Sequence, residues 1–242
     1  MCELTPNAGS VTAQLLGPLL TGDPHTPRLV LYAGTARTEL STASLANWSA
    51  KVAGLLVDEL GTSPGDPIAV RLGAGWQTAP ILLGCWWAGA VVTDADDPGA
   101  GAAFVADRQD ARADEVFVVS GHPLGAPSVT VLAHQRDFTT SVLGQADTFT
   151  AGPVLTDTAP AVYADGSTLS VGEVVRTARS AGERFGAKAR VLSDAPWTLP
   201  DPLVPLLLGA LAADGSLVQS VGDGGPSAEH LADVEKCTVR WS

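Results

Sequence analysis

Residues 68–93 read IAVRLGAGWQTAPILLGCWWAGAVVT, and this stretch decides the fold. Two short apolar runs, residues 68–72 and 90–93, flank an almost wholly apolar segment of helical length at 78–87. This composition predicts a strand, a helix and a second strand in close succession. Two strands connected through a helix run parallel with a right-handed crossover, because only that hand lets the helix pack back onto a twisted sheet. The sequence therefore predicts an α/β fold with mostly parallel sheets.

Elements of the same kind extend on both sides of this unit. On the N-terminal side we expect a hairpin, followed by an amphipathic helix that begins at Ser41 or Thr42. A Pro-Gly turn at residues 64–65 ends that helix region. The expected elements are a helix at 11–20, strands at 28–32 and 35–40, a helix at 41–60, a helix at 102–111, and strands at 116–119 and 129–132.

After residue 150 the same pattern starts again. Residues 144–158 are small and polar, so we place a boundary there between a first α/β lobe (1–150, with the N-terminal helix) and a second, incomplete lobe (151–242). Tyr32 and Tyr163 lie 131 positions apart, and the stretches 80–84 and 205–209 lie 125 apart. The expected second set is a hairpin at 161–164 and 167–170, helices at 171–185, 203–213 and 227–235, and strands at 191–193, 217–219 and 237–241.

Residues 39–98 carry a resemblance to a known family. The stretch contains LSTASL at 40–45, Gly61 followed by Pro-Gly-Asp at 64–66, Ala-Gly-Ala at 88–90 and Asp-Pro at 97–98. In order and spacing these pieces resemble the N-terminal lobe of the adenylate-forming (AMP-binding, acyl-CoA-synthetase-like) superfamily. The resemblance implies a large domain with two pseudo-symmetric lobes, which agrees with the internal repeat.

The same resemblance identifies a candidate phosphate loop that departs from the family pattern. The family grips ATP phosphates with backbone N–H groups and a lysine; here the matching residues are Asp165, Gly166, Ser167 and Thr168, with no lysine after them. Asp165 and Glu173 add negative charge instead. At an effective dielectric of about 20, one charge 4 Å away contributes about 4 kcal/mol. We therefore expect a vestigial loop, no catalytic residue, no cofactor and no metal ligand.

The resemblance also implies missing parts. The chain stops at Ser242, before the family's adenine-side motif, ribose-binding aspartate and C-terminal domain with its catalytic lysine. We therefore expect a catalytically inactive relic that acts as a binding or scaffold protein, and we favour this role over that of an enzyme. A homodimer or another protein partner is expected at the terminal strand 237–241, and five tryptophans are candidates for an interface. These are Trp48, Trp76, Trp86, Trp87 and Trp241, with Trp48 and Trp86 favoured as core residues.

Two alternatives remain open at this point. One is a small-molecule or nucleotide-binding enzyme of another class that uses the cleft between the lobes, with His122 or the cluster Asp94, Asp96 and Asp97 as candidate site residues. The other is half of a split enzyme whose remainder is a separate chain. Neither His122 nor the aspartate cluster has a partner residue at a telling spacing, and the altered phosphate loop argues against a split enzyme.

Composition limits the remaining function classes. A net charge of −12 disfavours nucleic acid and anionic membranes as partners, and no apolar run reaches the length of a membrane span. The N-terminus lacks the order of a secretion signal, so we expect a cytoplasmic protein. Three scattered cysteines form no disulfide framework, Cys85 is interpreted as a buried structural thiol, and the four histidines lack metal-site spacing. The excess of Arg over Lys and the high Ala content suggest a GC-rich genome, and the chain resembles short actinobacterial proteins that share this truncated front half.

Overall fold

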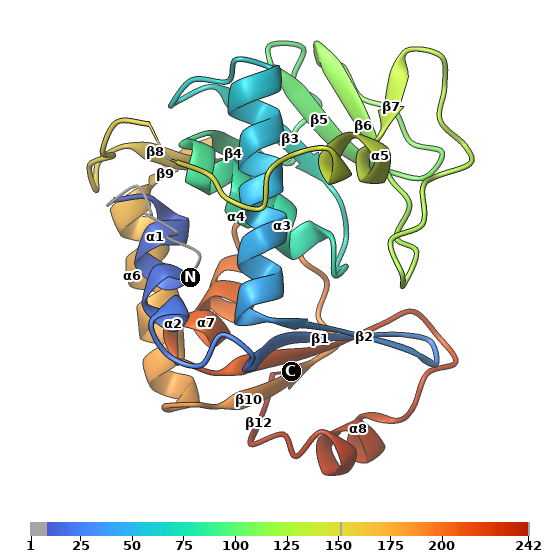
Figure 1. Ribbon diagram of the computed structural model, residues 1–242. Coiled ribbons are helices and arrows are strands. Elements are labelled where there is room, and N and C mark those ends of the chain that lie inside the picture. The colour runs from blue at the N-terminus through green and yellow to red at the C-terminus, as the bar shows by residue number, and fades with distance from the viewer. Residues whose placement is uncertain (1–8, 151, 242) are drawn as a thin grey trace.

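The computed structural model describes residues 9–150 and 152–241, and it contains two β-sheets with helices packed between them (Figure 1). We call the five-stranded sheet with the order β12-β10-β11-β1-β2 sheet A, and the seven-stranded sheet with the order β7-β6-β5-β3-β4-β8-β9 sheet B. Every neighbouring pair is parallel except the two hairpins, β1–β2 and β8–β9. The predicted α/β fold with mostly parallel sheets is confirmed.

The strands of the two sheets come from four stretches of the chain. Sheet A contains β1 (Pro27–Ala33), β2 (Ala36–Ser41), β10 (Arg190–Ser193), β11 (Ser216–Val221) and β12 (Val239–Arg240). Sheet B contains β3 (Pro67–Arg71), β4 (Val91–Thr93), β5 (Ala102–Ala106), β6 (Glu115–Val119), β7 (Gln135–Asp137), β8 (Pro160–Ala164) and β9 (Ser167–Ser170). Each sheet thus takes strands from both sides of residue 150, so the sheets do not divide there.

The helices cover the inner faces of both sheets, and one helix covers the outer face of sheet A (Figure 1). They are α1 (Val11–Leu15), α2 (Gly17–Leu20), α3 (Thr42–Gly54), α4 (Thr78–Ala88), α5 (Phe138–Leu143), α6 (Val171–Phe185), α7 (Gly209–Ala212) and α8 (Ala228–Val234). Two π-helical turns, η1 (Leu55–Glu59) and η2 (Val204–Leu208), continue α3 and precede α7. One large apolar cluster joins the inner faces of both sheets through α3, α4, α6 and α7.

The internal repeat is real, and its two copies exchange hairpins. Hairpin, helix, strand, helix and strand follow one another as β1-β2-α3-β3-α4-β4 and again as β8-β9-α6-β10-η2-α7-β11. The hairpin β1–β2 pairs with β11 of the second copy, while the hairpin β8–β9 pairs with β4 of the first. Both hairpins also carry a register shift at the same place, after Pro27 and after Pro160. The exchange explains why neither sheet belongs to one half of the sequence.

The helix pairs of the two copies pack through equivalent glycines. A Cβ on Gly84 would lie 2.5 Å from Val52 Cβ and 2.8 Å from the Ser49 carbonyl oxygen, so α4 approaches α3 closely. A Cβ on Gly209 would lie 2.8 Å from Ala181 Cβ, on the helix equivalent to α3. Contacts this short leave no room for a side chain, so both crossings depend on glycine.

Two predicted elements are wrong. The segment predicted as a helix at 102–111 forms strand β5 in the middle of sheet B, because its Ala-Ala-Phe-Val run is buried on both faces of a parallel sheet. The segment predicted as a strand at 129–132 is an irregular loop in which Val129 is 96% exposed. Its neighbours Ser128 and Thr130 donate hydrogen bonds to Asp107, which satisfies this loop without a sheet partner.

The tryptophans belong mainly to the core. Trp76, Trp86 and Trp87 are buried, and Trp48 is half-buried with its ring edge-on to Trp76, so these residues do not offer a free interface. Only Trp241 of the five lies in the wall of a surface pocket. Among the described residues, no helix is long and apolar enough to cross a membrane. Cys2 lies outside the described residues.

Candidate functional site

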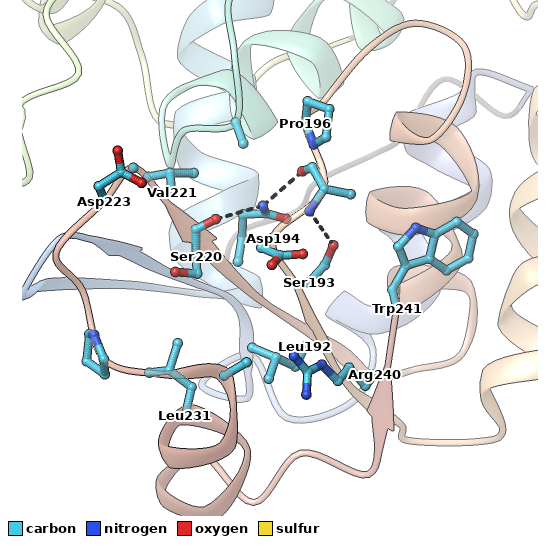
Figure 2. Close-up of a pocket in the computed structure, with 16 residues that line it drawn as sticks. Leu192, Ser193, Asp194, Pro196, Ser220, Val221, Asp223, Leu231, Arg240 and Trp241 are labelled. Atoms are coloured by element: carbon cyan, nitrogen blue, oxygen red, sulfur yellow. Dashed lines mark hydrogen bonds between the residues drawn. The ribbon is translucent and has the colours of Figure 1, made fainter.

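A pocket of about 530 Å³ opens at the carboxyl ends of β10 and β11, where α/β folds commonly bind ligands (Figure 2). Its floor and sides are the residues that follow these two strands, together with Ala74 from the loop after β3 of the other sheet. Leu192, Val221, Pro226, Ala228 and Leu231 supply the apolar wall. The pocket is therefore concave and partly apolar, as small-molecule sites usually are.

Gln219 fixes one wall of this pocket. Its side chain is fully buried, and its Nε2 donates to the carbonyl oxygens of Ala195 (3.0 Å) and Ser220 (3.1 Å). Its Oε1 accepts a hydrogen bond from the indole Nε1 of Trp197 at 3.1 Å. The Ser193 hydroxyl accepts from the Ala195 amide at 3.0 Å (Figure 2). The loop after β10 is thus held against β11 by a fully satisfied buried amide.

The opposite wall comes from the end of the described chain. The Trp241 amide donates to the Leu192 carbonyl oxygen at 2.8 Å, and the indole ring lies edge-on to Phe185 with ring centroids 5.7 Å apart. Arg240 lies beside it and forms an ion pair with Glu229 at 3.2 Å. The carboxylates of Asp194 and Asp223 are exposed at the rim. Because Arg240 is already paired, the pocket presents net negative charge to a ligand.

A charged cluster anchors the helix that closes the pocket from below. Glu235, which follows α8, is 8% exposed and accepts hydrogen bonds from Tyr32 (2.6 Å), Arg37 (2.7 Å) and Arg190. Arg37, Tyr32 and Arg190 lower the pKa of the Glu235 carboxyl to about 2. Burial and the Glu235 carboxylate raise the pKa of Tyr32. This cluster ties α8 to the outer face of sheet A and so sets the position of Leu231 in the pocket.

The predicted vestigial phosphate loop is the turn of a tight hairpin. Ala164 pairs with Ser167, so only Asp165 and Gly166 connect β8 to β9, with φ of 51° and 72°. Two adjacent residues with positive φ form a turn that matches the twist of a hairpin. The Glu173 carboxylate accepts from the amide and hydroxyl of Ser170 and completes a capping box, which lowers its pKa. Residues 165–168 line neither the pocket at the ends of β10 and β11 nor the larger hollow at the amino-terminal ends of these strands.

Of the other predicted site residues, Asp94 lines a hollow of about 270 Å³ between the two sheets, and the rest are engaged locally. The His122 ring accepts a hydrogen bond from the Leu124 amide in an exposed loop. The Asp96 carboxylate accepts from Arg112, and Asp97 accepts from the Gly99 amide. The described residues contain no cluster of metal-ligating side chains. Cys85 is fully buried, and burial raises the pKa of its thiol, in agreement with a structural role.

Sequence reasoning missed the residues of the pocket itself. Ser193, Asp194 and Ser220 follow strands that were predicted, and the usual position of sites in α/β folds could have identified them. Trp241 was considered only as an interface residue. Nothing in the sequence indicated that Gln219 would turn inward and hold the loop of the neighbouring strand.

Comparison with known proteins agrees with this architecture. No protein-family model matches the chain. The fold is that of about half of an acyl-CoA synthetase: the chain superposes on the Brucella canis acyl-CoA synthetase with a TM-score of 0.72, at 18% identity, over 94% of this chain and 45% of that enzyme. It superposes on an anthranilate CoA ligase in complex with anthranoyl-AMP with a TM-score of 0.73, at 14% identity, over 98% of this chain and 50% of that one. The chain thus spans about half the length of these two enzymes.

A full-length match exists in sequence. A TIGR03089 family protein of Mycobacterium tuberculosis is 36% identical over 246 residues, which cover 95% of this chain and 97% of that protein. The aligned region covers both copies of the internal repeat. The chain belongs to the TIGR03089 family.

Proposed function

We propose that this protein is a cytoplasmic, catalytically silent binding protein that keeps half of an acyl-CoA-synthetase-like fold without its adenylating chemistry. The proposal rests on one observation, the two-residue turn Asp165-Gly166. A phosphate cradle needs several backbone N–H groups that converge on one anion, and a two-residue hairpin turn provides no such loop. The turn also places a carboxylate where relatives of this fold are expected to hold a phosphate.

The proposal is tested by an assay of adenylate formation. Adenylate formation from ATP and a carboxylic acid is reversible, so it is measured by carboxylate-dependent exchange of pyrophosphate into ATP. We expect the purified chain to show exchange no higher than protein-free buffer with aliphatic and aromatic acids, while an intact acyl-CoA synthetase assayed in parallel shows it. Exchange that requires both the chain and a carboxylic acid would overturn the proposal.

The binding role is assigned to the pocket at the ends of β10 and β11. Asp194 and Asp223 repel an anionic substrate, whereas the apolar wall and Trp241 accept a hydrophobic body. We therefore propose a neutral or cationic ligand rather than a carboxylic acid. The alternative of a small-molecule enzyme that uses the cleft between the lobes would place its ligand elsewhere, in a hollow lined by Asp94 and Trp197.

Two probes of equal shape and opposite charge test this assignment. Phenethylamine should raise Tm in a thermal-shift assay, and 3-phenylpropionate should not. The double variant Asp194→Asn and Asp223→Asn should abolish the preference, while Asp233→Asn, on α8 but outside the pocket, should preserve it. Equal responses to both probes, or a preference that survives the double variant, would contradict the assignment.

We also propose self-association through sheet A. Among the described strands β12 pairs only with β10, so its other edge is available to a second copy. Sedimentation velocity at micromolar concentration should show a dimer. Arg240→Pro, which removes the backbone donor of β12 that faces away from β10, should shift the population to monomer. A wild-type chain that sediments as a monomer at these concentrations would refute this part of the proposal.

A further inference from the structure

A second pocket, of about 830 Å³, lies at the amino-terminal ends of β1, β10 and β11, on the opposite edge of sheet A from the pocket of Figure 2. It is bounded by α2, by α6 and by the loops that enter the three strands. Four of the chain's fourteen basic residues line it, against two acidic residues. The basic residues are Arg28, Arg179, Lys188 and Arg190, and the acidic ones are Asp23 and Asp214. In a chain of net charge −12 this is a local excess of positive charge.

Two of these cations are fixed in the wall. Arg28 is 3% exposed: its Nε donates to the Thr42 hydroxyl (2.8 Å), its Nη1 donates to the carbonyl oxygens of Asp214 and Gly215, and its Nη2 pairs with the Asp214 carboxylate. Arg190 Nη1 donates to the Ser216 hydroxyl at 3.0 Å. The Nε of Arg190 is buried and has no acceptor within the described part of the chain. Arg190 Nη2 is also paired with Glu235, so this side chain is a fixed positive charge in the wall.

The other two basic side chains of this pocket are free to contact a ligand. Arg179 on α6 and Lys188 in the loop before β10 are exposed, and neither forms an ion pair with another described residue. Beyond Arg179 the surface becomes mixed, because the next hollow along α6 adds Asp157 and Glu183 to Arg176. The excess of positive charge is thus confined to one hollow at the amino-terminal edge of the sheet.

The backbone at Lys188 gives an independent indication. The residue two positions before β3, β4, β10 and β11 has positive φ in every case: Gly65 (95°), Gly89 (83°), Lys188 (58°) and Asp214 (53°). The first repeat uses glycine at both positions, as this conformation favours. The second repeat instead uses two charged residues, and both line this pocket. This backbone conformation is unfavourable for residues other than glycine, so the second repeat keeps two side chains in this pocket at a cost in stability.

We propose that this pocket binds a small phosphate-bearing anion, with Lys188 and Arg179 as its mobile cations and with Arg28 and Arg190 as fixed positive charges in its wall. Asp214 orients Arg28 at the base of the pocket. The apolar residues Leu15, Pro18 and Leu19 on the facing wall accept the non-phosphate part of such a molecule. The ligand class is a phosphorylated small metabolite, because the pocket exceeds the size of free phosphate.

Calorimetric titration of the full chain with inorganic pyrophosphate tests the proposal at constant ionic strength. Wild type should bind saturably, and Lys188→Gly and Arg179→Gln should each weaken binding by about tenfold, the usual effect of losing a charged hydrogen bond. Lys188→Gly should at the same time raise Tm by about 2 °C, because the left-handed strain is relieved. A variant that is more stable but binds less cannot be explained by damage to the fold.

Lys236 supplies the matched control. It is an exposed lysine with φ of 53° that lies outside the pocket, so Lys236→Gly makes the same change in the same backbone conformation. It should raise Tm similarly and leave pyrophosphate affinity unchanged. Absence of saturable binding, or equal loss of binding in Lys188→Gly and Lys236→Gly, would overturn the proposal. Equal heats from sodium sulfate and pyrophosphate in all variants would show only general charge screening and would also overturn it.

Discussion

Sheet A and the five corresponding strands of sheet B have the same strand order but are covered differently. The orders β12-β10-β11-β1-β2 and β5-β3-β4-β8-β9 correspond strand for strand. Between β11 and β12 the chain forms α8, whereas between β4 and β5 it forms only a loop. The outer face of sheet A therefore packs Val30, Leu192 and Val218 against Leu231 of α8. The outer face of sheet B carries small residues, Ala69 and Ala103, under the loop residues Ala111 and Ala113.

The comparison shows that the two copies share their secondary structure and strand order but differ in the side chains that line their surfaces. Both copies keep the hairpin, the close helix crossing and the capped helix, since each of these is needed to build a parallel sheet with a covered inner face. The charged cluster at Glu235, the pocket of Figure 2 and the basic pocket occur only around sheet A. The side chains from which binding is argued thus gather around sheet A, which contains strands of both copies.

Removal of the Glu235 charge is expected to have the largest effect on stability. Glu235→Gln keeps the shape but leaves Arg37 and Arg190 without their carboxylate. The fall of the pKa from 4.5 to about 2 corresponds to about 3 kcal/mol, at about 1.4 kcal/mol per unit. Urea unfolding at pH 7 should show a loss of this order in the variant. Glu229→Gln, which removes an exposed ion pair with Arg240, should leave the unfolding midpoint unchanged.

The same pKa shift predicts how this loss depends on pH. Because the folded-state pKa lies below the unfolded one, the contribution of Glu235 is complete above about pH 4.5 and is lost as the pH falls toward about 2. Other carboxyls titrate in this range as well, so the informative quantity is the difference between wild type and Glu235→Gln. That difference should shrink steadily from pH 5 to pH 2.5. A difference that stays constant with pH would show that packing, rather than charge, explains the loss.

The two helix crossings should tolerate a methyl group unequally. Gly84→Ala would press against Val52 and the Ser49 carbonyl of α3, which is rigid backbone, so we expect a loss of about 2 kcal/mol. Gly209→Ala meets Ala181 and the edge of the Phe185 ring, which can turn aside, so the loss should be about 1 kcal/mol or less. The shift of the urea unfolding midpoint, at an unchanged m value, measures the loss of stability in each variant. Equal losses would mean that the two crossings are equally tight.

Much of this fold could be predicted from the sequence, because its elements are specified locally. The run at 78–87 is apolar on every side and becomes α4, buried on every side, and Ser170 with Glu173 defines the start of α6. The strand β5 was missed because Ala102 and Ala103 favour helix when isolated and enter a sheet only when both faces are covered. The exchange of hairpins was also not predictable, because the sequence of each hairpin does not specify which copy supplies its neighbouring strand.

The site was harder to predict than the fold. Asp165-Gly166 is a dipeptide that favours two-residue hairpin turns, and in the structure it connects β8 to β9 in such a turn. The pockets, by contrast, join residues that are far apart in sequence, such as Arg28 with Asp214 and Leu192 with Trp241. Lys188 is distinguished from an ordinary surface lysine only when its positive φ is compared with that of Gly65 at the equivalent position in the other copy. Long-range pairing of this kind is set by the tertiary fold, which no local pattern encodes.

The smallest expected difference concerns the two helix caps. Ser41 accepts from the Ser44 amide at the start of α3, and Ser170 accepts from the Glu173 amide at the start of α6. The Ser41 hydroxyl also contacts the Ser44 hydroxyl at 3.1 Å, whereas the Ser170 hydroxyl donates to the Glu173 carboxylate. Ser170→Ala therefore removes the hydroxyl half of a capping box and keeps the bond from the residue-170 amide to Glu173. We expect about 1 kcal/mol for Ser170→Ala and slightly less for Ser41→Ala, whose helix is held by burial along most of its length. If Ser41→Ala proved more costly in urea unfolding, the first helix would depend more on its cap than on packing against α4.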